Sequence, residues 1–428
     1  MTRTLYLFDD RVARGWEPFA LTRPVGELLF GSLLMRRRIE RSIGQEVAGY
    51  LATPGLDGFE ERGAPPVLAA DAFPREGERI LLSSRYLPPV PLGTDSSPEV
   101  ELPEEIPEGE VELWTEGERV GWLLAEGRSA PSVAELLDPT EAGSDGAARL
   151  TLPGRVLESP WQLMSESPRW IASDLARLYP GGRGGGATPL PSLVGVHRVG
   201  RHPVSAADGV RVDPGVVLDS REGPIHLGAR VHIMPLTHLH GPAFIGPDTT
   251  LLGGTMGSLT CGPRCKLRGE IEASVILGFS NKAHDGYLGH SLLGRWVNLG
   301  AGTTNSDLKN NYGPVRLDTS AGTVDTGLMK VGVFLGDHVK TGIGTLLNSG
   351  TLVGAGSNLF GGGMPGKAVP PFSWGVGDDL VPHRLEPFLQ TAERAMGRRE
   401  IPLTPGLRDF LARGWSSVHG SEAEREEP

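Results

Sequence analysis

Residues 335–358 read LGDHVKTGIGTLLNSGTLVGAGSN and repeat with a period of six. The first place of each six-residue frame is aliphatic or β-branched: Leu335, Thr341, Leu347 and Val353. The second place of three frames is glycine: Gly336, Gly342 and Gly354. The fifth place is small or β-branched: Val339, Thr345, Thr351 and Ser357. Such a period is the signature of hexapeptide β-helix repeats, in which three short strands form one coil and the first place stacks inward.

The same frame extends toward the N-terminus. It fits LGRWVN (293–298) and LGAGTT (299–304), and glycine arrives every few residues after Leu193. A glycine-rich antiparallel β domain is the alternative, but it predicts a period of two, which this region lacks. We therefore expect a parallel β-helix over residues 193–375, preceded by a linker over 181–192 whose composition is rich in glycine and proline.

The alternation of predicted strands and helices in residues 1–180 predicts an α/β domain. LYLF (5–8) is a short apolar strand, and a second strand is expected within 78–89. Apolar residues at near-helical spacing predict a helix within 26–43. A further helix is expected over 167–180, where serine stands at the N-cap and proline at the first helical position.

The C-terminal segment, 376–428, departs from the repeat. Apolar stripes predict helices over 385–399 and 405–414. We expect them to cap the open end of the β-helix, whose last coil would otherwise expose strand edges. The charged residues 416–428 predict a disordered tail.

Composition excludes several classes of partner. Among 428 residues, 41 Lys+Arg face 52 Asp+Glu, so the formal net charge is −11 and a nucleic-acid partner is disfavoured. Charged residues occur within the first ten positions, which disfavours a signal peptide. No apolar run approaches the roughly 18 residues of a membrane span. The only cysteines, Cys261 and Cys265, are a weak metal signal and fit a reducing compartment. We expect a cytoplasmic protein without a membrane partner.

Two histidines stand inside the repeat, in SNKAHDGYLGHSLLGRWVNLGAGTTN (280–305). A coil has flat faces, so a pocket is expected where neighbouring subunits face each other about a threefold axis. Imidazole has a pKa near working pH, and a turn histidine there can act as a general base. The pattern therefore predicts a homotrimer with His284 or His290 at a shared site.

The segment HDGYLGHSLLGRWVNLGAG, which begins at His284, resembles the hexapeptide-repeat acyltransferases. It is most similar to the acetyltransferase half of the bifunctional N-acetylglucosamine-1-phosphate uridylyltransferase/glucosamine-1-phosphate acetyltransferase. The resemblance implies a left-handed, trimeric β-helix with His284 as the catalytic base, although crossover connections are usually right-handed. It implies substrate contacts at Tyr287, Asn298, Asn311, Tyr312 and Arg316. Asn311 and Tyr312 lie within TTNSDLKNNYG (303–313), where an insertion places them about four residues further on than in the family, and Arg316 lies beyond it.

Other candidates come from the same comparison or from position alone. The resemblance implies acyl-CoA contacts on the later coils and exit loop, at Gly342, Gly354, Ala355, Gly361 and Lys367. From position alone, His290 is a candidate substrate contact and Arg268 a candidate for an anionic substrate group. Tyr287 and Trp296 would either stack on a sugar or adenine ring or cover a coil edge. His238 and His240 share one strand face, which is either a metal site or a hydrated surface, and His338 is expected at an exposed turn.

The opening segment, LYLFDDRVARGWEPFALTRPVGELLFG (5–31), resembles a divergent sugar nucleotidyltransferase fused to such a β-helix. Ordinary members carry L-A-A-G-x-G-T-R, whose glycine amides and arginine hold the phosphates of an NTP. That pattern is missing here, so Arg11, Arg14 and Arg23 would supply positive charge, and Asp9 and Asp10 would hold Mg²⁺. The alternative is a domain that kept the fold and lost or changed its chemistry.

These expectations combine into one principal function and two alternatives. The principal one is transfer of an acyl group from acetyl-CoA to an amino or hydroxyl group of a sugar phosphate or nucleotide sugar, with a nucleotidyltransferase activity in the N-terminal half. The first alternative is a uridylyl- or thymidylyltransferase whose β-helix only trimerises or regulates. The second is a non-catalytic scaffold.

Overall fold

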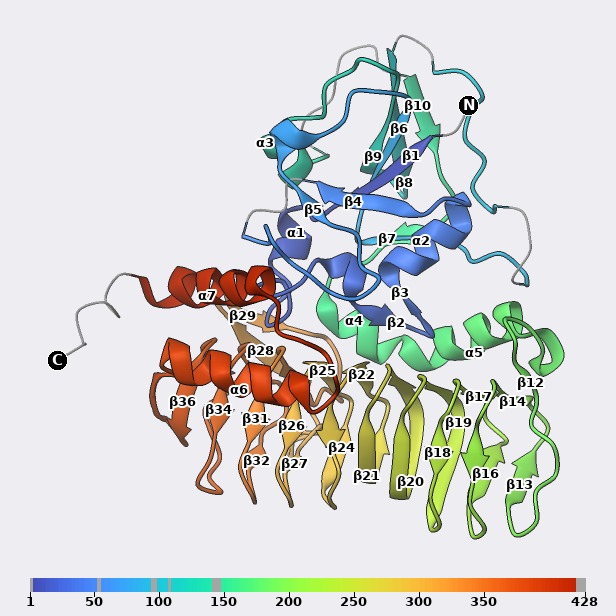
Figure 1. Cartoon of the computed structure of the whole chain (residues 1–428), viewed down its shortest axis with the longest axis vertical. Coiled ribbons are helices and arrows are strands. Elements are labelled where there is room, and N and C mark those ends of the chain that lie inside the picture. The colour runs from blue at the N-terminus through green and yellow to red at the C-terminus, as the bar shows by residue number, and fades with distance from the viewer. Residues whose placement is uncertain (1–2, 52–54, 94–97, 107–108, 141–147, 421–428) are drawn as a thin grey trace.

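The computed structural model describes residues 3–51, 55–93, 98–106, 109–140 and 148–420. An α/β domain stands above a long parallel β-helix, and two C-terminal helices lie between these two parts (Figure 1). The expected architecture of an α/β domain, a parallel β-helix and a helical C-terminal segment is therefore confirmed.

The N-terminal domain is built on a seven-stranded sheet in the order β10-β8-β9-β6-β1-β4-β5. Its strands are β1 (Thr4–Phe8), β4 (Val47–Leu51), β5 (Val67–Leu68), β6 (Arg79–Ser83), β8 (Glu110–Thr115), β9 (Glu118–Leu124) and β10 (Ala148–Thr151). The central strand β1 is parallel to both β4 and β6, while β9 runs antiparallel to β6. The strand predicted at 5–8 is confirmed as this central strand.

The helix predicted within 26–43 begins later than its apolar spacing indicates. A hairpin of β2 (Leu29–Phe30) and β3 (Leu33–Leu34) comes first, and α2 covers only Met35–Ile43. The turn contains Gly31 with φ +60°, which a side-chain-bearing residue rarely adopts. The Asp174 carboxylate accepts a hydrogen bond from the Ser32 amide at 2.8 Å and fixes this turn.

Helix α5 (Ser167–Leu178) connects the domain to the β-helix, close to the range that the sequence predicts. It follows α4 (Pro160–Ser165), and the Ser167 hydroxyl lies 3.2 Å from that of Thr260 on the β-helix. The expected linker is partly ordered into the solenoid, because β12 (Thr188–Pro189) pairs with β14. The domain also contains the short elements α1 (Arg11–Arg14), α3 (Val133–Leu137), β7 (Tyr86–Leu87) and β11 (Arg155–Val156).

The β-helix has three faces, each a ladder of parallel strands. Face A contains β13 (His197–Gly200), β16 (Val217–Ser220), β24 (Tyr287–Gly289), β27 (Thr304–Asn305) and β32 (Leu346–Leu347). Face B contains β14 (Val204–Ala206), β17 (Ile225–Leu227), β22 (Val275–Gly278), β25 (Leu292–Arg295), β30 (Val333–Leu335), β33 (Thr351–Val353) and β35 (Ala368–Val369). Face C contains β15 (Arg211–Val212), β18 (His232–Ile233), β23 (Asn281–Lys282), β26 (Asn298–Leu299), β31 (Lys340–Thr341), β34 (Asn358–Leu359) and β36 (Ser373–Val376).

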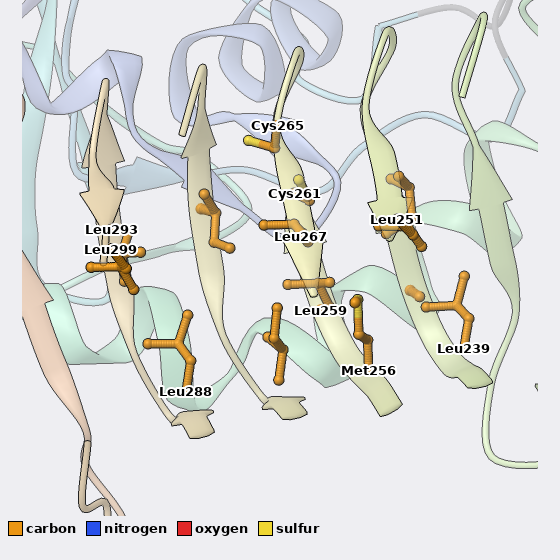
Figure 2. Close-up of a cluster of buried hydrophobic side chains, with 14 of the residues drawn as sticks. Leu239, Leu251, Met256, Leu259, Cys261, Cys265, Leu267, Leu288, Leu293 and Leu299 are labelled. Atoms are coloured by element: carbon orange, nitrogen blue, oxygen red, sulfur yellow. The ribbon is translucent and has the colours of Figure 1, made fainter. Parts of the chain in front are cut away.

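Three longer strands bend around corners and belong to two or more faces: β19 (Thr237–Ile245), β20 (Thr250–Cys261) and β21 (Lys266–Glu272). We name each corner after the two faces that it joins in chain order, so that the C/A corner leads from face C to face A. The first places of the six-residue frames all point inward, because none of the four is more than 4% exposed. Figure 2 shows such aliphatic side chains stacked from coil to coil. Each fully buried leucine contributes about 1.5–3 kcal/mol.

One coil carries an insertion, residues 306–332, before the chain returns to face B at β30. Within it, β28 (Arg316–Thr319) and β29 (Gly322–Asp325) form a hairpin. Val315 and Leu317 belong to the same apolar cluster as Trp16 and Phe19 of the N-terminal domain. Face B and the insertion therefore carry the N-terminal domain.

The C-terminal helices do not lie over the end of the β-helix, so the expected cap is wrong in position. Helix α6 (Leu385–Gly397) runs along the B/C corner, from Phe372, whose ring lies 5.1 Å from that of Phe388, to Asn281, which Arg399 reaches at 2.6 Å. Helix α7 (Pro405–His419) packs on α6 and on Phe59. The last coil ends in a hairpin of β36 with β37 (Asp379–Pro382). The predicted tail lies largely outside the described residues, although α7 continues into its first four residues.

Candidate functional site

His284 lies at the C/A corner, in the bend between β23 and β24, and its side chain is exposed. Below it, Lys282 Nζ donates to the carbonyl oxygens of His284 at 2.9 Å and Arg268 at 3.0 Å. Burial lowers the pKa of Lys282 to about 8. Asp285 accepts from Arg268 Nε at 3.0 Å and therefore does not orient the neighbouring imidazole. The corner thus presents an accessible imidazole beside two cationic side chains.

His290 lies at the other end of the same face-A strand, at the A/B corner, with φ 46°. Its Nδ1 is 2.7 Å from Asp307 Oδ2, and the Tyr287 hydroxyl donates to the same oxygen at 2.6 Å. Burial alone would raise the pKa of Asp307, but the hydrogen bonds from His290 and Tyr287 outweigh it and hold that pKa below its usual range. Burial, reinforced by the adjacent Asp307, raises the pKa of Tyr287 well above that of a free phenol.

Sequence reasoning missed Asp307, although a signal for it exists. The pairs His290–Asp307, Asn281–Asn298 and Tyr287–Thr304 are each separated by 17 residues, which is one coil in this part of the β-helix. Applying that spacing to His290 leads directly to the carboxylate at the start of the insertion.

Further polar side chains continue along face A. His238 lies 3.7 Å from Asp219, and His240 lies 3.5 Å from Glu272. The His240 ring lies across Gly257, where an added Cβ would come within 1.9 Å of it. Within the described part of the chain, no group of three His, Cys, Asp or Glu side chains is arranged to hold a metal ion. The arrangement therefore favours the polar surface over the metal site.

The remaining substrate candidates lie in two other places. Asn298 is on face C, where its Oδ1 accepts from Asn281 Nδ2 at 3.3 Å. Asn311, Tyr312 and Arg316 are exposed on the insertion, and Arg316 lies 3.5 Å from Asp325 in the hairpin. The structure thus joins Arg268 to the His284 corner and Tyr287 to His290, and it places the other four candidates apart from both groups.

The acyl-CoA candidates also divide. Gly342 and Gly361 follow face-C strands near the C/A corner, and Gly361 is exposed. Lys367 precedes β35 and is half-buried. Gly354 and Ala355 are buried at the B/C corner, where a Cβ on Gly354 would meet Pro371.

Trp296 and His338 both lie at the B/C corner. Trp296 stacks on Phe279 at 4.4 Å between ring centroids, and His338 stacks on Trp296 at 6.2 Å. The expected exposure of His338 is wrong, because helix α6 covers this corner and leaves the residue 8% exposed. Burial lowers the pKa of His338 to about 3, so the ring is neutral. Both side chains line a cavity of about 610 Å³ at the junction with the N-terminal domain, which places Trp296 on a corner that His284 does not share.

The three arginines proposed for phosphate binding have separate partners within the chain. Arg11 pairs with Asp138 at 2.5 Å, and Arg14 donates to the Ala20 carbonyl at 2.6 Å. Arg23 is buried and donates to Asp337 of the β-helix at 2.9 Å. Arg23 is therefore part of the junction between the two domains.

Asp9 and Asp10, the proposed Mg²⁺ ligands, follow the central strand β1. Asp10 caps helix α1 and accepts from Arg85 Nε at 2.8 Å and from the Ser83 hydroxyl at 2.9 Å. Asp9 is buried and accepts from the Val25 amide at 3.0 Å. Burial raises the pKa of Asp9 to about 6. Ligands of α/β sheets usually bind at such strand ends, and in this chain arginine and serine side chains already engage Asp10 there.

Comparison with known proteins bears on both halves. Residues 5–181 match the family model described as sugar nucleotidyl transferase. A bifunctional sugar-1-phosphate nucleotidylyltransferase/acetyltransferase of Sulfurisphaera tokodaii is 32% identical over 100 residues, which are 23% of this chain and 25% of the relative. The bifunctional protein GlmU of Synechococcus elongatus is 29% identical over 163 residues, which are 38% of this chain and 28% of the relative.

A solved structure of an Arabidopsis UDP-N-acetylglucosamine acyltransferase aligns with 54% of this chain and 91% of its own, at 13% identity and a TM-score of 0.20. The chain spans about a quarter of the length of the curated relatives it matches. The expected resemblance to bifunctional nucleotidyltransferase/acetyltransferases is confirmed. The coarser fold class is confirmed as well, because a domain that matches a sugar nucleotidyl transferase family model is joined to a parallel β-helix, whereas the left hand of the β-helix stays a prediction. Among the described helices, none is long and apolar enough to cross a membrane.

Proposed function

We propose that this chain transfers an acyl group, expected to be acetyl, from acyl-CoA to an amino or hydroxyl group of a sugar phosphate or nucleotide sugar. The observation that carries the proposal is the exposed imidazole of His284 at the C/A corner, beside Arg268 and Lys282. An imidazole near its working pKa can take the acceptor proton, and nearby cations can hold an anionic substrate group.

In the proposed reaction His284 accepts the proton as the acceptor oxygen or nitrogen attacks the thioester carbonyl carbon. A backbone N–H would stabilise the resulting oxyanion. The C–S bond then breaks, and the CoA thiolate takes up the proton. Neither cysteine suits a covalent acyl intermediate, because Cys261 and Cys265 are both fully buried in the β-helix core.

We further propose that the working site lies between subunits of a homotrimer. The faces of a single coil are flat, and a second subunit facing the C/A corner would enclose the acceptor and exclude water. The acyl-CoA would then run along the later coils, where Gly342 and Gly361 stand on the same side of the β-helix as His284.

The test is release of CoA thiol from acetyl-CoA with a panel of sugar phosphates and nucleotide sugars. We expect His284→Ala to lower kcat by about 10²–10⁴, the usual contribution of a general base. His202→Ala, which removes an exposed histidine near the start of the solenoid, is the matched control and should leave kcat unchanged. A His284→Ala rate within threefold of wild type on a verified acceptor would place the base elsewhere.

A second candidate function, nucleotidyl transfer to a sugar 1-phosphate, is favoured by the family match over residues 5–181. The phosphates would approach the carboxyl ends of β1 and β6, and Mg²⁺ would be held by Asp9 and Asp10. Neither aspartate lies in an arrangement of three metal-ligating side chains within the described residues, so the substrate phosphates would have to complete the coordination.

A further inference from the structure

The hydrogen bonds around Asp307 determine which atoms His290 and Tyr287 offer to a ligand. The carboxylate is held ionised and can only accept, so the nearby His290 Nδ1 must carry the proton. The Tyr287 hydroxyl likewise donates its only proton to Asp307. When the His290 ring is neutral, its Nε2 and the phenolic oxygen of Tyr287 therefore remain as hydrogen-bond acceptors.

The surrounding backbone makes this unit rigid. The end of the insertion clamps both residues, because the Gly332 amide donates to the His290 carbonyl at 2.7 Å and the Val331 amide donates to the Asp307 carbonyl at 2.8 Å. The Tyr287 hydroxyl lies over Gly289, where an added Cβ would come within 2.0 Å of it. The side chains of His290 and Asp307 are only 17% and 11% exposed. A pre-set geometry of this kind reduces the entropy lost on binding.

The charges near this unit favour the same kind of ligand. Glu272, on the preceding coil, is close enough to His240 and His290 for both to influence its pKa, which burial raises. Its carboxylate oxygens add further acceptors. Lys330, at the end of the insertion, is a nearby cation whose charge helps to lower the pKa of Asp307. Phosphate and carbonyl groups offer only acceptors and would find no donor in the pair that neutral His290 forms with Tyr287.

We propose that Asp307 is a positioning residue which sets His290 and Tyr287 as a pair of acceptors, and that this pair recognises two adjacent donors on the ligand, as on the hydroxyl-bearing edge of a sugar ring. The inference rests on the proposed function and refines its substrate class. The anionic group of the acceptor would lie away from this pair, toward Arg268 at the opposite end of the face-A strand.

The test compares binding of glucose 1-phosphate and its monodeoxy analogues by calorimetry, using the full-length protein. For wild type we expect removal of one particular hydroxyl to weaken binding roughly tenfold, as the loss of one well-made hydrogen bond does. Asp307→Asn should weaken binding of the parent sugar by a similar factor and should abolish the distinction between parent and analogue. Asp318→Asn, in the hairpin, is the matched control and should behave as wild type.

Tyr287→Phe keeps the ring, removes one acceptor and provides a second variant if Asp307→Asn melts early. In turnover, both variants should raise the KM for the acceptor more than they lower kcat, because the contact is expected in ground and transition states alike. Binding without any CoA release by wild type would refute the proposed acyl transfer and leave this inference standing. Failure of wild type to bind any of these sugars, or equal discrimination by Asp307→Asn and wild type, would overturn the inference.

Discussion

Asp337→Asn is expected to weaken the attachment of the N-terminal domain to the β-helix. The Asp337 carboxylate is buried and accepts from Arg23 Nε at 2.9 Å, from the Thr22 hydroxyl at 2.9 Å and from the Arg295 amide at 2.7 Å. Glu61 links the same two arginines, at 3.2 Å from Arg23 and 2.7 Å from Arg295. The substitution keeps the shape of the side chain and leaves two buried guanidinium groups with one carboxylate.

The size of the effect follows from burial. Breaking a buried pair by removing one partner costs about 3–5 kcal/mol, and we expect the lower part of that range because Glu61 still neutralises one charge. Asp248→Asn is the matched control. It breaks a bidentate pair with Arg230 whose side chains are 30% and 65% exposed, and exposed pairs contribute only about 0–1 kcal/mol.

The pH dependence has a definite sign. Burial alone would raise the pKa of Asp337, but Arg23 outweighs it and holds the pKa below the usual range. The stabilisation is therefore complete above the ordinary pKa of aspartate, about 3.9, and is lost as pH falls through the lower folded value. The difference between wild type and Asp337→Asn should be constant from pH 5 to 8 and should shrink only in acid.

Thermal melts and limited proteolysis measure the effect. We expect Asp337→Asn to lower the melting midpoint by roughly 5 °C or more and Asp248→Asn to shift it by far less. Proteolysis of the variant should begin at the junction and release the β-helix. If the two variants melted within one degree of each other across pH 5–8, the buried bridge would not be what holds the domains together.

Three further outcomes are expected. Gly257→Ala should push the His240 ring away from Glu272 and lower the melting midpoint. Gly313→Ala should leave the melting midpoint unchanged, because the nearest atom to the added Cβ, in the Asn311 side chain, would be 3.3 Å away. Light scattering should give about three times the 45.6 kDa chain mass, and a clean monomer would exclude a site shared between subunits. Pyrophosphate release with Mg²⁺, each NTP and several sugar 1-phosphates should be weak or absent, because Arg85 and Ser83 already engage Asp10, and robust turnover would instead support the second candidate function.

Local periodicity predicted the β-helix because the six-residue frame recurs over 293–304 and 335–358. The side chain at the first place of each frame must fill the interior of the β-helix, so an aliphatic or β-branched residue recurs there in the sequence. The same logic predicted the C-terminal helices but not their position. The apolar stripe of each helix indicates only that one side of the helix is buried. The helices pack on the B/C corner because the aromatic side chains of Phe279, Trp296 and Phe372 lie along it.

The junction between domains was beyond sequence reasoning for a different reason. Arg23 and Asp337 are separated by 314 residues, and no local pattern marks two charges as partners at that distance. Arg23 was therefore interpreted as a phosphate ligand. For the candidate site, the motif located His284, whereas Asp307 required the coil length of 17 residues, which the insertion after Asn305 obscured.

The distribution of covered and open surface limits where an enclosed site can form. The N-terminal domain and the insertion cover face B, and helix α6 covers the B/C corner (Figure 1). Large apolar side chains remain exposed at the C/A corner, where Leu236 is 83% and Ile343 77% exposed. Large exposed apolar side chains are one mark of a surface that another chain covers. A second subunit would therefore be expected along the C/A corner, beside His284. In that arrangement the CoA part of the donor would meet Gly342 and Gly361, whereas Gly354 and Ala355 are buried at the B/C corner, away from the second subunit.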